Sequence, residues 1–373
     1  MNIIGKVSII GAGTMGAGIA INVVLAGHHV TLIDTQLNVL EQAAVRLKIF
    51  FKRQVDKSRL TSLEADAAIS RLSLSSSLID AAGSGLVIEA VFENLEVKRQ
   101  VFVDLERVID HTTILATNTS ALSVRDIGSG LNHPTRLCGL HYFSPAEVNP
   151  VVEVISSALS DEKIVKKILN FALSCGKTPI LCRDRSGFAL NRFFCPYTNE
   201  AVRCMDEGKG TPAQIDHIAK ETFGLAVGPF FVMNIIKPKI NLAAIRNLAH
   251  LDPFYEPAAS MVSYGDAGKS WNLTEQAEIL KPKVARVISD RLKGAVFFAV
   301  LQALVEKVAT PCDIDLGAQK AFTFTIGPCK MMVECGEAEV GRLVELVQFG
   351  ASGLVYSVWP QLEEFKKTNK SSN

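Results

Sequence analysis

Two side chains that can move a proton, His141 and Glu153, stand in two successive apolar segments, residues 136–145 and 151–155. An ionised carboxylate inside an apolar segment is costly unless it is paired. Two neighbouring strands would bring Glu153 to His141, where the carboxylate would fix the imidazole tautomer and raise the basicity of the other ring nitrogen. That arrangement suits a general base. A purely structural His–Glu pair is the alternative that the spacing leaves open.

A glycine-rich turn near the N-terminus predicts a dinucleotide site. The apolar run 7–10 leads into it, and a stretch of small residues leads out as a helix. Such a turn needs glycine for tightness, for close approach to a pyrophosphate and for helix packing. Asp34 follows the next apolar run, about 20 residues on, where it can bind a ribose hydroxyl. No Arg follows Asp34 at once, which favours NAD over NADP. The expected cofactor contacts are Gly11, Gly13, Thr14, Met15, Gly16 and Asp34.

Polar residues follow two further predicted strands. Residues 89–94 come after the apolar run at 85–90, and residues 117–120 come after the run at 113–116. Ligands of parallel sheets bind beyond the carboxyl ends of the strands, so both segments are site candidates. Turn chemistry alone would also account for Asn118 and Ser120.

These residues need an α/β framework to position them. Strands alternate with helical patterns through residues 1–186, which predicts a Rossmann-type, doubly wound parallel sheet with helices on both faces. A long basic helix is expected over residues 36–59. Its charges form either a solvated face or a patch for a phosphorylated substrate. Its central lysines are Lys48, Lys52 and Lys57.

The C-terminal half contains an internal repeat. Residues 191–233 align without gaps onto residues 290–332, and a Thr-Pro-x-x-Ile-Asp segment recurs at 211–216 and 310–315. That segment is typical of a capped helix start with Pro at the first position. We therefore expect two all-α domains, residues 187–285 and 286–373, that form a pseudo-symmetric pair. The first is expected to face the active site, and the second, which has Asp290 in place of Asn191, is expected to be structural.

Composition limits the possible partners. The formal net charge is +1, which gives no indication of nucleic acid or an anionic membrane as a partner. The longest apolar stretch, around residues 294–301, is too short to span a bilayer. The eight cysteines form no CxxC and have no metal-ligand spacing, so we expect no metal and reduced thiols in a cytoplasmic protein.

Together these motifs resemble the L-3-hydroxyacyl-CoA dehydrogenases, the family that includes 3-hydroxybutyryl-CoA dehydrogenases. The resemblance covers roughly residues 1–235 in family order, and longer members of the family also carry a second C-terminal unit. The motifs that carry it lie at residues 11–20, 88–94, 117–122, 141–145, 152–155, 191–193, 196–201 and 228–230.

The resemblance implies reversible, NAD-dependent oxidation of the 3-hydroxyl of an (S)-3-hydroxyacyl-CoA to the 3-ketoacyl-CoA, a reaction of fatty acid β-oxidation. His141 would be the general base and Glu153 would orient it. Ser120 and Asn191 would hydrogen-bond the reacting oxygen. The resemblance adds further expected cofactor contacts, and it places the coenzyme A phosphates near the basic helix. These further contacts are Glu93, Lys98 and Asn118, and the substrate-binding candidates are Lys48, Lys52, Lys57, Ser120 and Asn191.

One segment departs from the family pattern. After residues 228–230 the family usually has an Asp and then a Gly, whereas this chain has a loop with Asn234 and Lys237. The altered loop leaves room for a thioester on an acyl carrier protein, as in relatives from secondary metabolism. A non-catalytic NAD-binding module and an oxidoreductase of free hydroxy acids or sugar acids are the other hypotheses. The repeat is compatible with a monomer containing an internal pseudo-dimer or with a homodimer.

Overall fold

The structure is a computed structural model that describes residues 4–273 and 279–370. The chain forms two compact units, residues 1–184 and 185–373. The predicted boundary at Ser186–Gly187 lies just beyond this division. The predicted first helical domain, 187–285, includes residues 274–278, which lie outside the described residues. The predicted start of the second domain at residue 286 falls inside a helix that begins at Pro282.

The first unit contains an eight-stranded sheet in the order β3-β2-β1-β4-β5-β6-β7-β8. All neighbouring strands are parallel except β6 and β7, which are antiparallel. The predicted doubly wound, mainly parallel sheet is confirmed, and β6 and β7 depart from it because the connection over residues 143–150 is too short for a helical crossover. The strands are β1 (Lys6–Ile10), β2 (His29–Ile33), β3 (Leu72–Ser75), β4 (Leu86–Glu89), β5 (Ile114–Thr117), β6 (Leu137–Tyr142), β7 (Val151–Ser156) and β8 (Thr178–Arg183).

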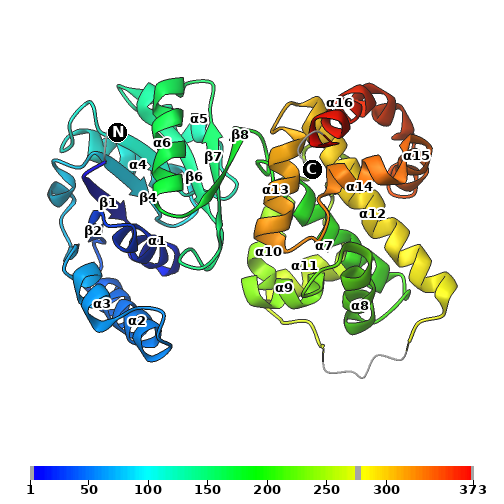
Figure 1. The fold of residues 1–373 in the computed structure, drawn as a ribbon, viewed down its shortest axis with the longest axis horizontal. Coiled ribbons are helices and arrows are strands. Elements are labelled where there is room, and N and C mark those ends of the chain that lie inside the picture. The colour runs from blue at the N-terminus through cyan, green and yellow to red at the C-terminus, as the bar shows by residue number, and fades with distance from the viewer. Residues whose placement is uncertain (1–3, 274–278, 371–373) are drawn as a thin grey trace. The chain divides into compact units, whose positions relative to one another are not determined.

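Helices cover this sheet. The first helix, α1, packs on β1 and β2, and α6 packs on β6, β7 and β8, on the near face in Figure 1. The basic helix α2 is slightly shorter than the predicted range 36–59 and keeps Lys48, Lys52 and Arg53 exposed. Arg46 is half-buried and forms an ion pair with Glu147 at 3.1 Å. The helices of the unit are α1 (Thr14–Leu25), α2 (Leu37–Asp56), α3 (Ser62–Ile69), α4 (Leu95–Glu106), α5 (Val124–Gly128) and α6 (Glu162–Ser174), with short 3₁₀ turns at Leu78–Ala81 and Pro134–Arg136.

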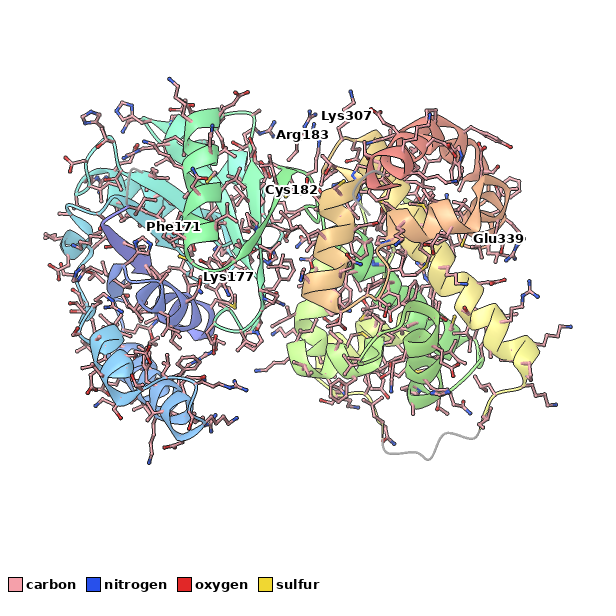
Figure 2. All side chains as sticks on the ribbon, viewed as in Figure 1. Phe171, Lys177, Cys182, Arg183, Lys307 and Glu339 are labelled. Atoms are coloured by element: carbon pink, nitrogen blue, oxygen red, sulfur yellow. The ribbon has the colours of Figure 1, made fainter. Side chains whose placement is uncertain are left out.

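A buried lysine holds the connection between β6 and β7. Lys177 lies just before β8 and, with Phe171 of α6, is labelled in Figure 2. Its Nζ donates to the carbonyl oxygens of Ala146 and Asn149, both at 2.7 Å. Burial lowers the pKa of Lys177 to about 8. The two strands that carry His141 and Glu153 are thus joined by a fixed turn.

The second unit is helical and consists of two successive sets of helices. Their boundaries recur at a constant offset: α8 spans Pro212–Phe223 and α13 spans Pro311–Phe322, while α9 spans Pro229–Ile236 and α14 spans Pro328–Cys335. The second set therefore repeats the first 99 residues later. The remaining helices are α7 (Asn191–Asp206), α10 (Pro238–Arg246) and α11 (Ala259–Ala267) in the first set, and α12 (Pro282–Val305), α15 (Glu337–Glu345) and α16 (Ser352–Lys370) in the second, with a 3₁₀ turn at Pro253–Tyr255.

The two repeats pair crosswise along α7 and α12, which pack against each other (Figure 1). Arg192 at the start of α7 forms an ion pair with Glu306, at the end of α12. The equivalent Arg291 forms one with Glu207 at 2.5 Å. Each arginine thus pairs with the acidic residue of the other repeat, as in the self-complementary interface of a twofold dimer.

The departure at residues 234–237 is largely helical, so the expectation of a loop is corrected. Ile235 and Ile236 continue α9, and Asn234 lies in its last turn. The Asn234 side chain pairs with the backbone of Trp271: its Nδ2 donates to the carbonyl oxygen at 2.9 Å, and its Oδ1 accepts from the amide at 2.7 Å. Asn234 therefore fastens the segment that follows α11.

Lys237 is the junction between α9 and α10, and its backbone is strained. It has φ 75° and ψ 130°, whereas the second repeat has Gly336 at the equivalent position, with φ 84°. Non-glycine residues in such regions cost about 1–3 kcal/mol.

We expect Lys237→Gly to raise the free energy of unfolding by about 1 kcal/mol, after the greater freedom of glycine in the unfolded chain is allowed for. Thermal unfolding would measure this gain. Gly336→Lys is the reciprocal control and should destabilise; a Lys237→Gly variant less stable than the parent would contradict the strain.

The cysteines lie mostly in the core. Six of the eight cysteines are buried. Within the described residues, no helix is both long and apolar enough to cross a membrane.

Candidate active site

The glycine-rich turn joins β1 to α1 with the geometry that a dinucleotide needs. Gly11 has φ 101°, and a side chain at Gly16 would lie 1.8 Å from the Gly11 carbonyl oxygen. Around Gly13, by contrast, nothing lies within 4 Å of the position of a side-chain carbon. Gly13 also precedes the first turn of α1, formed by Thr14 and Met15, whose amide groups have no side-chain cap. The turn therefore leaves room for an anion at a helix N-terminus, where the dipole favours it, and fits a pyrophosphate.

Asp34 is fixed beside this turn at the end of β2. Its Oδ2 accepts a hydrogen bond from the Ala12 amide at 2.9 Å, and its Oδ1 accepts one from the Gln36 amide at 2.9 Å. The position matches the carboxylate expected to bind a ribose.

A buried charge cluster lies at the end of β4. Lys98 of α4 is 1% exposed, and its Nζ lies 2.7 Å from Glu89 Oε1 and 3.2 Å from Glu93 Oε2. Thr117 donates to the other oxygen of Glu89 at 2.6 Å. Burial raises the pKa of Glu89, even though Lys98 opposes this shift. The Lys98 ammonium group is buried and pairs with both Glu89 and Glu93. The predicted contact of Lys98 with the cofactor would therefore be made by a buried ammonium group next to Glu93.

Glu93 holds the loop after β5. Its Oε1 accepts from Thr119 Oγ1 at 2.6 Å, from the Ser120 amide at 2.9 Å and from Ser120 Oγ at 3.2 Å. Burial alone would raise the pKa of Glu93, but the charge of Lys98 and these hydrogen bonds lower it overall. The carboxylate therefore stays ionised and fixes Ser120 at the edge of the sheet.

His141 and Glu153 face each other on β6 and β7. They are directly opposite in the antiparallel register, and His141 Nδ1 lies 2.7 Å from Glu153 Oε2. Glu153 is fully buried and His141 is 6% exposed. Asn118 links the neighbouring strand ends, because its Oδ1 accepts from the Tyr142 amide at 2.8 Å. The structure therefore places His141, Glu153 and Asn118 in one cluster of the first unit.

The other predicted site residues lie elsewhere in the chain. Asn191 is the first residue of α7 and belongs to the second unit. Lys48 and Lys52 are exposed on α2, and Lys57 follows its last residue, also exposed. Glu89 lies in one of the candidate segments predicted from the sequence, but its pairing with Lys98 was not predicted. A carboxylate that ends an apolar strand was the available signal.

Two family models match the chain. The model described as "3-hydroxyacyl-CoA dehydrogenase, NAD binding domain" matches residues 6–185, and "3-hydroxyacyl-CoA dehydrogenase, C-terminal domain" matches residues 187–277. The chain belongs to the 3-hydroxyacyl-CoA dehydrogenase family. It is therefore an NAD-dependent oxidoreductase, and NAD is its cofactor. The second match ends before α12, so it covers only the first of the two helical repeats.

Individual members of the 3-hydroxyacyl-CoA dehydrogenase family show the same relation. The chain is 34% identical over 266 residues to the "Probable 3-hydroxybutyryl-CoA dehydrogenase" of Bacillus subtilis. This alignment covers 70% of this chain and 92% of that protein. It is 35% identical over 237 residues to the "3-hydroxyadipyl-CoA dehydrogenase" of Escherichia coli, covering 64% of this chain and 50% of that relative. A crystal structure of 3-hydroxybutyryl-CoA dehydrogenase from Escherichia coli matches 97% of this chain and 100% of its own with a TM-score of 0.87; at 22% identity this likeness shows the fold alone.

Among the described residues, no group of three or more His, Cys, Asp or Glu side chains is arranged to hold a metal ion.

Proposed function

We propose that the protein interconverts (S)-3-hydroxyacyl-CoA and 3-ketoacyl-CoA thioesters. The observation that carries the proposal is the buried contact of 2.7 Å between His141 Nδ1 and Glu153 Oε2. Bound NAD would supply the hydride acceptor for C3 of the substrate, and the hydride donor in the reverse direction. The work of the protein is therefore to remove a proton from the 3-hydroxyl and to stabilise the oxygen that loses it.

In this proposal His141 receives the hydroxyl proton at Nε2. The Glu153 carboxylate holds the Nδ1 proton, which fixes the tautomer, and its negative charge balances the imidazolium that forms. Ser120 and Asn191 donate hydrogen bonds to the reacting oxygen. Glu93 sets the position of Ser120, since it binds both the amide and the hydroxyl of that residue.

Cofactor and coenzyme A contacts complete the proposal. The amide groups at the start of α1 would bind the pyrophosphate, with Asp34 on one ribose and Glu93 near the second. Asn118 and Lys98 would support the nicotinamide side of the site. The exposed lysines of α2 and Lys57 would bind the phosphates of coenzyme A, to which a basic surface is complementary.

An apolar pocket in the second unit is a candidate for the acyl chain. It encloses about 110 Å³, and Phe194, one helical turn after Asn191, is part of its wall. A chain whose C3 oxygen is held by Asn191 would therefore have an apolar surface within one turn of α7. The other lining side chains include Tyr197, Leu225, Val227, Val232 and Phe322.

The second repeat suggests a substitution that would fill this pocket. Leu225 lines the pocket, and its equivalent in the second repeat is Phe324, which is 2% exposed. We expect Leu225→Phe to lower kcat/KM for substrates with long acyl chains by about tenfold, because lost apolar contacts and steric overlap each cost 1–3 kcal/mol. A series of 3-ketoacyl-CoA substrates of increasing length would measure this. The four-carbon substrate is the internal control; equal losses at every length would contradict the assignment of the pocket.

The pairing of the two repeats predicts a monomer. The crosswise ion pairs of Arg192 and Arg291 occupy, within one chain, an interface of the kind that joins two protomers. Light scattering should give a mass near 40.4 kDa. A mass twice as large at every concentration would show instead that another surface forms a homodimer.

The decisive assay is oxidation of NADH with acetoacetyl-CoA, followed by the nicotinamide absorbance. Saturable turnover is expected. The same ketoacyl group on an acyl carrier protein should be a poorer substrate. Faster turnover of the carrier-bound thioester would assign the exposed basic face of α2 to a carrier protein instead. Binding of NADH without turnover of either thioester would favour a non-catalytic module.

A further inference from the structure

The residue on each side of Asn191 is held by the second repeat. Asn191 is the first residue of α7. Before it, Leu190 is fully buried and packs against Gly317 of α13. After it, Arg192 is 1% exposed and forms its ion pair with Glu306. The position of Asn191 thus depends on contacts with the second repeat as well as on contacts within the first.

Gly317 is adapted to this contact. A side-chain carbon at residue 317 would lie 2.4 Å from Leu190 Cδ2 and 3.2 Å from its Cγ. Leu190 is enclosed and cannot turn into solvent to make room. Glycine within a helix is less stable than alanine, so its presence in α13 calls for a packing reason. The equivalent residue of the first repeat is Ile218, which shows that this helical position accepts a large side chain elsewhere.

Arg192 fixes the tight loop that leads into α7. Its Nη1 donates to the Ser186 carbonyl oxygen at 3.1 Å, and its amide donates to the Gly187 carbonyl oxygen at 3.0 Å. Gly187 has φ 78°, which glycine adopts readily, whereas Phe188 has φ 47°, so the loop is strained at Phe188 and depends on its surroundings. Glu306 supplies the carboxylate that holds the guanidinium in this place.

The two crosswise ion pairs are not equivalent. Arg291 binds Glu200 in addition to Glu207, each at 2.5 Å. The residue equivalent to Glu200 in the second repeat is Ala299, so Arg192 depends more heavily on Glu306. Asp290, the equivalent of Asn191, is itself engaged in an ion pair with Arg342 at 2.8 Å.

We propose that Glu306 and Gly317 are positioning residues for Asn191, so that the second repeat sets the turnover number and is more than a scaffold. The inference rests on the proposed role of Asn191 at the reacting oxygen. A donor displaced by about 1 Å loses much of its effect on the transition state while substrate and cofactor binding are largely kept.

The experiment compares matched variants of the full chain in acetoacetyl-CoA reduction. Glu306→Ala and Gly317→Ala are expected to lower kcat about tenfold or more, with KM, the Kd for NADH and the melting temperature changed far less. Glu207→Ala removes a carboxylate of the mirrored ion pair, and Gly341→Ala adds a methyl group in α15, where the nearest atom lies 3.9 Å away. Both controls should keep kcat within about twofold of the parent. Asn191→Ala is the reference for complete loss of the donor.

The outcomes distinguish failure of the role proposed for Asn191 from failure of the positioning role proposed for Glu306 and Gly317. Normal kcat in Asn191→Ala would remove the proposed role of Asn191, and this inference with it. Loss of kcat in Asn191→Ala together with normal kcat in both positioning variants would overturn the inference alone. Equal losses in Glu306→Ala and Glu207→Ala would also overturn it, since they would reflect the stability of the repeat pair. If Glu306→Ala does not fold, the comparison of kcat between Gly317→Ala and its control Gly341→Ala decides: equal kcat in the two variants would overturn the inference.

Discussion

Replacing His141 by alanine should lower kcat for acetoacetyl-CoA reduction by at least 10²-fold, the usual contribution of a positioned general acid or base. The variant should still bind NADH, because the glycine turn and Asp34 lie on other strands of the sheet. Stopped turnover with retained binding is the signature of a lost proton-transfer group. Steady-state kinetics and fluorescence titration with NADH would measure the two quantities.

The chain offers a matched control for His141. His217 and Glu221 form a second His–Glu pair, at 3.3 Å, but both side chains are more than half exposed on α8. His217→Ala should therefore leave kcat unchanged. Near-normal kcat in His141→Ala would exclude that residue from proton transfer and leave the pair with Glu153 as a structural one.

Gly13→Ala should raise the Kd for NADH by at least about tenfold, since the second glycine of the turn is the one that lets the backbone approach the pyrophosphate. Its φ is −65°, so alanine fits the backbone without strain. Apart from its chain neighbours, no atom of the described residues lies within 4 Å of the new methyl group, so the fold should be kept. The methyl group would occupy the space that the cofactor needs. Isothermal calorimetry and thermal unfolding would show weakened binding with an unchanged melting temperature.

Gly5→Ala provides the comparison, because it also adds a methyl group with no atom of the described residues within 4 Å other than its chain neighbours. Gly5 lies ahead of β1 and outside the turn. It should change neither binding nor stability. Unaltered NADH affinity in Gly13→Ala would mean that the cofactor does not approach this turn.

The first unit could be predicted closely from local pattern. Apolar runs bounded by polar residues gave the strands, and the cost of burying Glu153 among apolar residues was enough to pair it with His141. The reversal of β7 could not be read from hydrophobicity, which is the same for parallel and antiparallel strands once both faces are covered. It follows from the short connection that Lys177 holds.

The second unit was harder to predict in detail. The repeat was visible as aligned residues, and the expected pairing of its two copies follows from their likeness. That Arg192 meets Glu306 rather than its own repeat's Glu207 depends on which helix faces which, and sequence spacing does not contain this information. The role of Gly317 is of the same kind, because a glycine inside a helix signals close packing without naming the neighbour.

The fusion of two like halves in one polypeptide has an evolutionary consequence. In a dimer of identical chains, every substitution appears at two positions related by the twofold axis, so a change that helps one subunit's role must be tolerated in the other subunit. Here Lys237 of the first repeat corresponds to Gly336 of the second, and Leu225 corresponds to Phe324. Each half has been free to mutate on its own. Covalent linkage thus released the two ends from sharing one sequence, and one end could specialise for chemistry while the other specialised for support.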